Sequence, residues 1–489
     1  MTKREIRTQY SGFILFTAKL LTVATGIAFT LMIARSVTQP EYGVYGTLNI
    51  IIPYFTILST AIPFWVMRFV ARDKEGAAKT GIVANTVIAA IAMLVYAAFF
   101  PLMITTFRLE GYIMLCGVAA AQIIEFYLIA VLEACLQAQR PHFVGYGLLV
   151  GEVCKVTFAY IFIIGLELSL LGAILSIVIA LAIRIAFYFK TIWKELQAKI
   201  AFSYTKEWIK GSTFNIYNII GDRIAAILFL MIPTYGGEIA TSYYQAAVSI
   251  ANIVTYSSFL AYALYPKILA ENAIEDATIS LKMVLMFAIP MTIGALAIPQ
   301  SYLIILKDIY SVATPILIIL TLDALILTIS SIFNTVLYGI EKVDAKAKIP
   351  FKQVAKSRLF IVFSLPYVHS LITLPTAFYI LTNFTKNEPL LVATYVTAIN
   401  TAAHLAMFIV VYTIVRKNVK VKIPWRSIAK YIFASIFMAI ILIAVHPTRL
   451  ILTLSVTAVG GIVYLALLML IDRETRTLAT AVLQEIRKR

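Results

Sequence analysis

Long apolar segments alternate with short polar ones along the whole chain. Fourteen of these segments are about 20 residues long, which at a rise of ~1.5 Å per residue is enough to cross a hydrocarbon core of ~30 Å. The pattern therefore predicts an all-α polytopic membrane protein with about 14 transmembrane helices. The predicted spans, numbered 1 to 14 in chain order, are 11–35, 45–67, 81–107, 111–137, 144–166, 168–189, 211–233, 241–265, 281–306, 311–338, 359–381, 389–415, 431–445 and 450–471.

The positively charged residues gather in alternate loops between these spans. The exceptions in the opposite loops are Arg108, Lys307, Lys386 and Arg449, and those within spans are Lys19, Arg35, Lys155, Arg184 and Arg223. By the positive-inside rule, both termini are predicted to lie in the cytoplasm, with the protein in the cell membrane. A net charge of +17 would suggest a nucleic-acid partner in a soluble chain. This chain has 61% hydrophobic and 13% charged residues, a composition far from that of a soluble protein. Its positive net charge therefore reflects the basic loops between spans, and no nucleic-acid partner is expected.

The chain also resembles itself. When span 2 is laid on span 8, Tyr45 matches Tyr244 and Arg68 matches Lys267. Shared apolar composition is the alternative explanation. A true repeat predicts two pseudo-symmetric six-helix lobes of the same orientation, with a cleft between them, plus two C-terminal helices. The predicted parts are an N-terminal lobe (1–193), an amphipathic cytoplasmic linker (194–210), a second lobe (211–415), two additional transmembrane helices (416–471) and an amphipathic cytoplasmic tail (472–489).

Charged residues inside spans 1 and 7 are the first candidates for a site, because an ionisable group costs a few kcal/mol or more within a membrane unless it has a partner or a wet cavity. Lys19 and Arg223 occupy similar positions in two spans that the repeat makes equivalent. Arg35 ends span 1, and Asp222 precedes Arg223. If these cations face inward, they line the cleft between the lobes.

A second group of charges lies in spans 4 to 6. Its members are Glu125, Glu133, Glu152, Lys155 and Arg184. Acids and bases can satisfy each other here, so we favour structural ion pairing over a proton or sodium relay. Asp323, His369 and His404 are read as lone groups within spans, with hydrogen-bonded packing the favoured role for the histidines and a titrating role left open. The candidates for ion coupling are Glu125, Glu152, Lys155 and Asp323.

Metal and cofactor chemistry find little support in the sequence. The three cysteines, Cys116, Cys135 and Cys154, lack metal-ligand spacing, and buried free thiols are expected. There is no P-loop either, so neither a metal, a cofactor nor direct use of ATP is expected.

Several short motifs resemble one known family. They are IARSVTQPEYGVYG after span 1, IGDRIAAILFLMIPTYGGEIATSYYQAA across spans 7 and 8, YPKILAE after span 8, and LKDIYSVATPILIILTL before span 10. They are similar to the polysaccharide-exporter branch (Wzx-like) of the multidrug, oligosaccharidyl-lipid and polysaccharide flippase superfamily. The resemblance implies a two-lobed transporter that moves a lipid-linked oligosaccharide from the cytoplasmic to the outer leaflet by alternating access, with spans 1, 2, 7 and 8 lining its cavity.

Other functions stay open as alternatives. Lipid II flippases of this superfamily show an Arg-Asp pair in span 1, where this chain has Arg35 and Ser36. Multidrug transporters often rely on acidic residues in the first spans, and none occurs in residues 11–40. A membrane glycosyltransferase or polymerase needs an acidic site and a sizeable outer loop, which the short outer connections do not provide. We therefore do not expect an enzyme.

The expected cargo has an anionic phosphate or pyrophosphate that joins a glycan to a polyprenol. Sugars and phosphate need a wet cavity to cross hydrocarbon, and the phosphate needs cations such as Lys19, Arg35 and Arg223. Tyrosine hydroxyls and ring faces suit sugars, and the four candidate tyrosines are Tyr45, Tyr54, Tyr243 and Tyr244. For Tyr45 and Tyr244, interfacial anchoring is at least as well supported as sugar binding. The expected partners are this lipid-linked glycan, membrane lipids and enzymes of glycan biosynthesis.

Overall fold

The computed structural model describes residues 21–22, 24–261, 275–340, 358–386, 388–419, 421–472 and 475–476. Every regular element within these ranges is a helix, which confirms the all-α prediction. The labelled α-helices are α2 (Gln39–Phe55), α3 (Pro63–Ala71), α4 (Ala77–Thr106), α5 (Ile113–Gln139), α6 (Pro141–Ala159), α7 (Ser169–Thr191), α8 (Phe202–Gly211), α9 (Thr213–Thr255), α11 (Glu275–Ala297), α12 (Pro299–Leu306), α13 (Thr314–Ile340), α15 (Arg358–Asn383), α16 (Pro389–Asn418), α17 (Trp425–Val445) and α18 (Leu450–Ile471).

Eleven candidate membrane spans occur among the described residues. A shorter apolar helix, Ala24–Ser36, covers the described part of span 1. Span 14 coincides with α18, whose bounds are Leu450–Ile471. The protein is thus a multi-pass membrane protein, and the total of fourteen spans stays a prediction.

Proline residues divide two of the predicted spans. Span 2 consists of α2 and α3, and Pro63 begins α3. Span 9 consists of α11 and α12, and Pro299 begins α12. The first position of a helix tolerates proline because its N–H would have no intrahelical partner there. Pro366 and Pro375, in contrast, lie inside α15.

Helix α9 contains a reversal that the sequence predicts between spans 7 and 8. Gly237 has φ 64° and ψ −161°, a conformation that glycine adopts without the steric cost of a side chain. The rings of Phe229 and Tyr244 lie 5.4 Å apart, whereas a straight helix would separate residues 15 positions apart by ~22 Å. The two parts of α9 are therefore antiparallel, and we call residues 213–236 the first arm and residues 238–255 the second arm.

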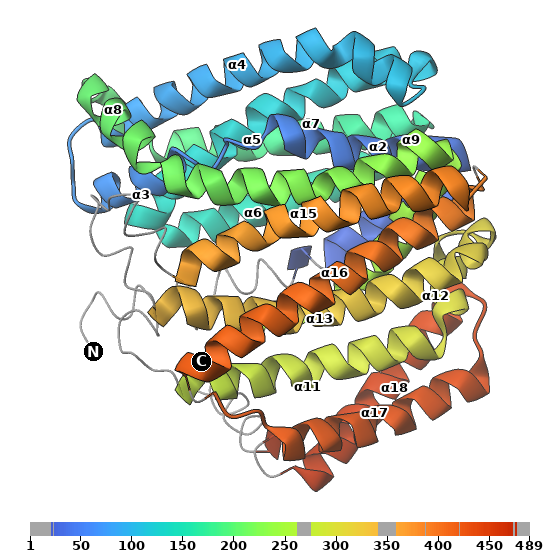
Figure 1. The fold of residues 1–489 in the computed structure, drawn as a ribbon. Helices are drawn as coiled ribbons and strands as arrows, with labels where there is room; N and C mark the ends of the chain where they lie inside the picture. Colours follow the sequence, from blue (N-terminus) through green and yellow to red (C-terminus); the bar gives the residue numbers. More distant parts are fainter. Residues whose placement is uncertain are drawn as a thin grey trace. The chain divides into compact units, whose positions relative to one another are not determined.

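The chain forms two compact units. The first holds Met1–Gln245, Ala347–Ala355 and Phe363–Val392, and the second holds Ala246–Lys346, Lys356–Val362 and Ala393–Arg489. In the first unit, α5 packs against α3, α4 and α7, and α7 also packs against α6 (Figure 1). In the second unit, α11 packs against α13 and α17, and α17 packs against α18. The predicted six-helix lobes group the helices differently, and they stay a prediction.

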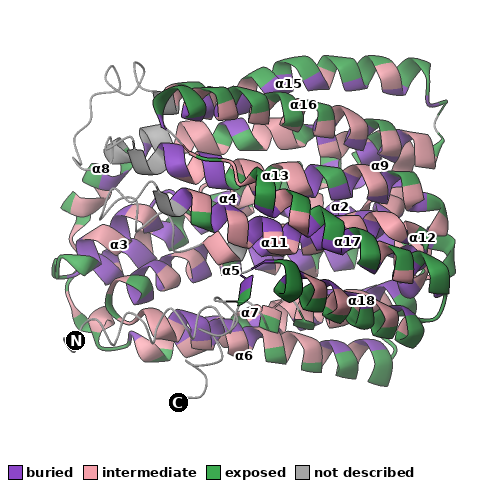
Figure 2. Cartoon of the chain, turned by 90° about the horizontal axis from the view of Figure 1, so that it is seen from below, coloured by how far each residue is buried: buried purple, intermediate pink, exposed green. Residues whose placement is uncertain are grey.

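The helix surfaces match a lipid surrounding. Buried residues follow α3, while exposed residues dominate α18 (Figure 2). Leu94 on α4 and Leu371 on α15 are 70% and 77% exposed. Apolar surface of this extent is unfavourable in water and is favourable against acyl chains.

The predicted amphipathic linker contains α8, which lies against the first unit. Trp208 of α8 is fully buried and its ring lies 5.5 Å from that of Phe69 on α3. Phe202, at the start of the same helix, is 73% exposed. One face of α8 therefore belongs to the apolar core, which fixes the chain before α9 begins.

The additional helices α17 and α18 are tied together at one end. The Lys430 ammonium donates to Asp472 Oδ1 at 2.8 Å, and the Thr475 hydroxyl donates to Asp472 Oδ2 at 2.8 Å. Burial opposes ionisation of Asp472, but these bonds outweigh it and hold the pKa of the carboxyl below its ordinary value. Tyr464 also donates to the Met286 carbonyl at 2.6 Å, which joins α18 to α11.

A partly buried ion pair joins α5 to α7 in the first unit. Arg184 pairs with Glu133, and the Tyr188 hydroxyl lies 2.9 Å from the same carboxylate. The Tyr188 hydroxyl also lies 3.0 Å from the Val144 carbonyl of α6. The Glu133 carboxylate and the Tyr188 hydroxyl therefore join three helices, as expected for structural pairing.

Replacing Glu133 by alanine is expected to lower the free energy of unfolding by ~1–3 kcal/mol, because it leaves the partly buried Arg184 guanidinium without its counter-ion. The control is Glu195→Ala. Glu195 pairs with Arg140 at 3.0 Å, where the Arg140 side chain is 40% exposed, so the loss should be ~1 kcal/mol or less. Denaturation in detergent micelles measures both losses, and equal losses would contradict the structural role of the Arg184–Glu133 pair.

Candidate functional site

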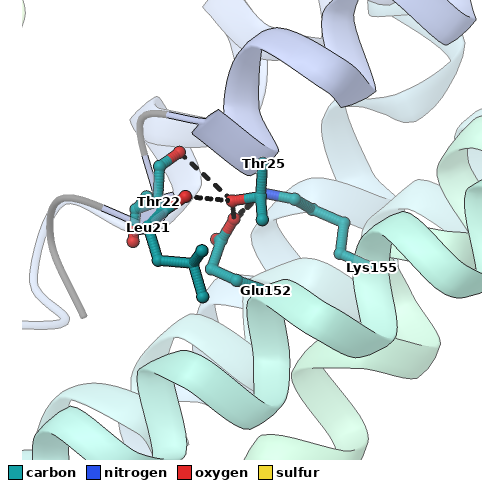
Figure 3. A network of polar contacts seen from close by, with 5 residues as sticks. All are labelled: Leu21, Thr22, Thr25, Glu152 and Lys155. Atoms are coloured by element: carbon teal, nitrogen blue, oxygen red, sulfur yellow. Dashed lines mark hydrogen bonds and ion pairs between the residues drawn. The ribbon is translucent and has the colours of Figure 1, made fainter. Parts of the chain in front are cut away.

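A polar network lies among apolar helices of the first unit. The Thr25 hydroxyl of helix Ala24–Ser36 lies 2.6 Å from Glu152 Oε2, and Lys155 Nζ donates to both oxygens of Glu152 at 2.8 and 2.7 Å (Figure 3). Lys155 Nζ also lies 5.4 Å from the centre of the Phe29 ring. Glu152 and Lys155, two members of the group for which ion pairing was favoured, are thus paired in the structure. The network adds a tie between the first helix and α6 that the sequence did not indicate.

The predicted cation Arg223 lies on the first arm of α9, close to α2. Its guanidinium is within electrostatic range of the Tyr54 hydroxyl. That hydroxyl is buried and has no hydrogen-bond partner among the described residues. None of the ion pairs formed by the described residues involves Arg223. The Tyr54 hydroxyl can therefore still donate a hydrogen bond, and Arg223 supplies a positive charge that none of those ion pairs uses. Together the two groups suit an anion.

Near Asp222, the first arm of α9 and helix α15 each contribute one ring to an aromatic pair. The rings of Tyr217 and Tyr367 stack with centroids 4.7 Å apart, and Tyr367 donates to the Tyr217 carbonyl at 2.7 Å. Gly221 makes room for the pair, since a Cβ there would lie 2.7 Å from Tyr367 Cε2. Asp222 is exposed, and its Oδ2 lies 3.5 Å from Asn218 Nδ2. This surface therefore presents aromatic rings, an amide and both signs of charge, groups that bind sugars.

The two glycines at the start of α2 pack directly on the second arm of α9. A Cβ at Gly43 would lie 1.9 Å from the Glu238 carbonyl oxygen, and one at Gly46 would lie 3.0 Å from Thr241 Cγ2. The charge pattern of the sequence predicts that this end of the helices lies outside the cell. Burial raises the pKa of the Glu238 carboxyl, Arg108 opposes the effect and Glu110 adds to it. The α2–α9 contact therefore lies at the predicted outer end.

Two apolar cavities lie beside these helices. In the first unit a cavity of about 230 Å³ is lined by α2, α4 and α9, and Tyr54 is the residue of the predicted site that reaches it. In the second unit a cavity of about 430 Å³ lies among the second arm of α9, α11, α12, α17 and α18. Tyr302 and Thr457 line it and share a hydrogen bond of 2.9 Å. Both cavities suit hydrocarbon.

Two predicted lone groups of the second unit are paired in the structure. His404 Nδ1 on α16 lies 2.8 Å from Asp323 Oδ1 on α13. The sequence could not show this, because 81 residues separate the two positions. Glu125 of the first unit is buried, and its Oε2 has no hydrogen-bond partner among the described residues.

Comparison with known proteins identifies the fold. No protein-family model and no curated protein sequence matches the chain. Solved structures do match. The lipid II flippase MurJ in an inward closed conformation has a TM-score of 0.69 at 15% identity, covering 94% of this chain and 99% of the flippase. A multidrug resistance MATE transporter of the MOP superfamily, inward-facing, has a TM-score of 0.60 at 12% identity, covering 83% and 98%. The MATE multidrug transporter DinF-BH has a TM-score of 0.58 at 13% identity, covering 84% and 95%.

This chain has the fold of those transporters. The structures of the group include inward-facing and outward-facing conformations of a MATE transporter. At 12–15% identity the likeness shows the fold and leaves the cargo of this chain open. Within the described part of the chain, no group of three or more potential ligands could hold a metal ion.

Within this fold the structure brings only part of the predicted site together. Tyr54, Asp222 and Arg223 lie near one another, whereas Tyr244 packs on Phe229 near the α9 reversal. Tyr45 stacks on Tyr42 with centroids 6.1 Å apart, and Tyr243 is half-buried. Arg35 is exposed at the end of its helix. Lys19 lies outside the described residues.

The residues that the sequence did not indicate are Thr25, Phe29, Tyr217 and Tyr367. Thr25 and Phe29 accompany Glu152 and Lys155, and the only sequence signal for them is their place in span 1. Tyr217 comes shortly before Asp222 in the same helix, and Tyr367 follows Pro366 in predicted span 11. Their partnership depends on the packing of α15 against α9.

Proposed function

We propose that this protein moves a lipid-linked oligosaccharide, joined to a polyprenol by phosphate or pyrophosphate, from the cytoplasmic to the outer leaflet by alternating access. The extent of the structural match carries the proposal. The lipid II flippase covers 94% of the chain, whereas the multidrug transporters cover 83–84%. The difference is comparable with the length of α17 and α18, the additional pair that borders the larger apolar cavity.

The chemistry of the first unit supports an anionic head group. Arg223 offers a positive charge, and Tyr54 offers a hydroxyl without a partner among the described residues. Charge-assisted hydrogen bonds to phosphate contribute about 1.5–3 kcal/mol each. The stacked Tyr217 and Tyr367 add ring faces for sugars. The sequence prediction adds Lys19 and Arg35 as further cations of the cavity.

The apolar cavity of the second unit supports a lipid tail. Its lining is almost wholly hydrocarbon, with Tyr302 and Thr457 satisfied by each other. A polyprenyl chain bound there keeps out of water while the head group crosses through a polar path. Membrane lipids and enzymes that build the glycan are the proposed partners.

Transport into vesicles tests the proposal. The purified full chain, reconstituted in phospholipid vesicles, is expected to move a fluorescent phosphate-linked oligosaccharide lipid faster than an uncharged glycolipid with the same sugars. A fluorescent organic cation of the rhodamine class should not be transported. Equal rates for the two lipids, or transport of the dye alone, would contradict the proposal. Comparing lipid II with a phosphate-linked glycan of different sugars then separates a lipid II flippase from a polysaccharide exporter.

A further inference from the structure

Helix α8 has one face in the core of the first unit and another face that the first unit leaves exposed. The rings of Tyr204 and Trp208 lie 5.2 and 5.5 Å from that of Phe69 on α3. Phe202, Lys206 and Ile209 share a different side of the helix, because they are four and three residues apart. All three are exposed, Phe202 by 73% and Ile209 by 57%. We call these three residues the exposed face of α8.

Both ends of α8 are fixed to helices that belong to membrane spans. The helix lies beside the start of α4 (Figure 1). Just before α8, the Ala201 N–H donates to the Thr80 hydroxyl of α4 at 2.9 Å. Just after it, the Trp65 indole N–H donates to the Ser212 hydroxyl at 3.0 Å. Since α4 and α9 are candidate spans, α8 is held at the level where these spans begin.

The linker around α8 carries a positive charge on its exposed positions. Among the described residues of 190–209, Glu207 is the exposed acid, and the exposed bases are Lys190, Lys194, Lys199 and Lys206. The other acid of this stretch, Glu195, pairs with Arg140. None of the ion pairs formed by the described residues uses these four lysines. The contacts of the described residues therefore leave most of this charge without a counter-ion.

Apolar side chains and lysines on one face suit the surface of a bilayer. Water is unfavourable for Phe202 and Ile209, and hydrocarbon is unfavourable for the Lys206 ammonium. The headgroup layer accommodates both, because apolar side chains reach the acyl chains while the ammonium stays among the phosphates. The lysines attract anionic headgroups and gain nothing comparable from zwitterionic ones. Charge complementarity therefore favours anionic phospholipids.

We propose that the exposed face of α8, together with the lysines around it, binds anionic phospholipids of the leaflet on which α8 lies. Phe202 and Ile209 insert between the headgroups, and Lys199 and Lys206 contact the phosphates. Bound lipid holds the start of α9 at the membrane surface, because a single residue, Ser212, separates α8 from α9. This binding does not depend on the transport function proposed above.

Quenching by spin-labelled lipids tests the binding. The full chain carries a bimane label on Ser203→Cys, which is exposed beside Phe202, and alanine replaces its three native cysteines. It is reconstituted in phosphatidylcholine vesicles that contain a small fraction of nitroxide-labelled phosphatidylglycerol or phosphatidylcholine. The anionic lipid should be preferred by about fivefold for each lysine in contact. Lys206→Gln should therefore lower the preference about fivefold, and high salt should reduce it toward one.

A label on Asn383→Cys is the matched control. This exposed residue ends α15 and precedes Phe384, which is 57% exposed, but the nearby charges of Lys386 and Glu388 balance. Both lipids should quench a label there equally. At position 203, Phe202→Ser should weaken quenching by both lipids to the same extent, because it removes the apolar contact and keeps the charges.

Two outcomes would overturn the proposal. If neither lipid quenches the label at position 203 while both quench the label at position 383, the exposed face of α8 lies against water or a protein partner. If both lipids quench the label at position 203 equally, and Lys206→Gln changes nothing, the face contacts the bilayer without a preference for anionic headgroups. A vesicle that supports no lipid movement leaves both measurements valid, since neither uses the cargo.

Discussion

Gly43→Ala is expected to lower the rate of lipid movement about 5- to 150-fold, without loss of folded protein. The added Cβ would lie 1.9 Å from the Glu238 carbonyl oxygen, and its two next contacts are also backbone atoms. A side-chain rotation cannot relieve such an overlap, so α2 and the second arm of α9 must separate. Overpacking of this kind costs about 1–3 kcal/mol. This cost corresponds to an about 5- to 150-fold decrease in the population of the state in which the outer end is closed.

The state of the outer end can be measured directly. Thr241 is fully buried beside Gly46, so a cysteine at this position, in a chain without Cys116, Cys135 and Cys154, should react slowly from outside. Gly43→Ala should accelerate that reaction. The control is Gly117→Ala, because no atom lies within 4 Å of a Cβ at Gly117. Unchanged labelling and unchanged transport in Gly43→Ala would show that this contact does not gate the outer end.

Arg223→Ala is expected to reduce movement of the phosphate-linked lipid about 10- to 150-fold, which corresponds to the loss of one charge-assisted interaction of about 1.5–3 kcal/mol. Arg223→Glu should reduce it further, because it adds a negative charge beside Asp222. Arg223→Lys should recover part of the rate, since lysine keeps the charge and loses the planar donor geometry. Vesicle assays with the phosphate-linked lipid and the uncharged glycolipid measure these effects, and only the former should depend on the charge.

The controls separate binding from folding. Arg108→Ala removes an exposed cation at the predicted outer end and should leave transport within about fivefold of the wild type, since exposed charges contribute ~1 kcal/mol or less. Lys19→Ala is expected to resemble Arg223→Ala, as the repeat predicts. If Arg223→Ala instead reduces the amount of folded protein in the membrane, the residue has a structural role and the electrostatic account of the cargo is wrong.

Helix type and approximate bounds were available from the sequence because a span has to be apolar over about 20 residues whatever it packs against. Span 14 agrees with α18 to the residue, and Gly237 lies in the turn predicted between spans 7 and 8. The predicted helix bounds were less exact at Pro63 and Pro299, because the chain stays apolar on both sides of a proline that starts a new helix. The Glu152–Lys155 pair was within reach because its members are three residues apart on one helix.

The candidate sites depended on contacts between distant segments. Asp323 and His404 each read as isolated in the sequence, and only the approach of α13 and α16 makes them a pair. The stacking of Tyr367 on Tyr217 and the contact of Gly43 with Glu238 are of the same kind. The sequence by itself determined that the chain crosses the membrane many times and which rare polar residues enter it, because the bilayer acts on each segment separately. Which of those residues meet was decided only by the tertiary structure, because side-chain partners depend on how helices far apart in the chain pack together.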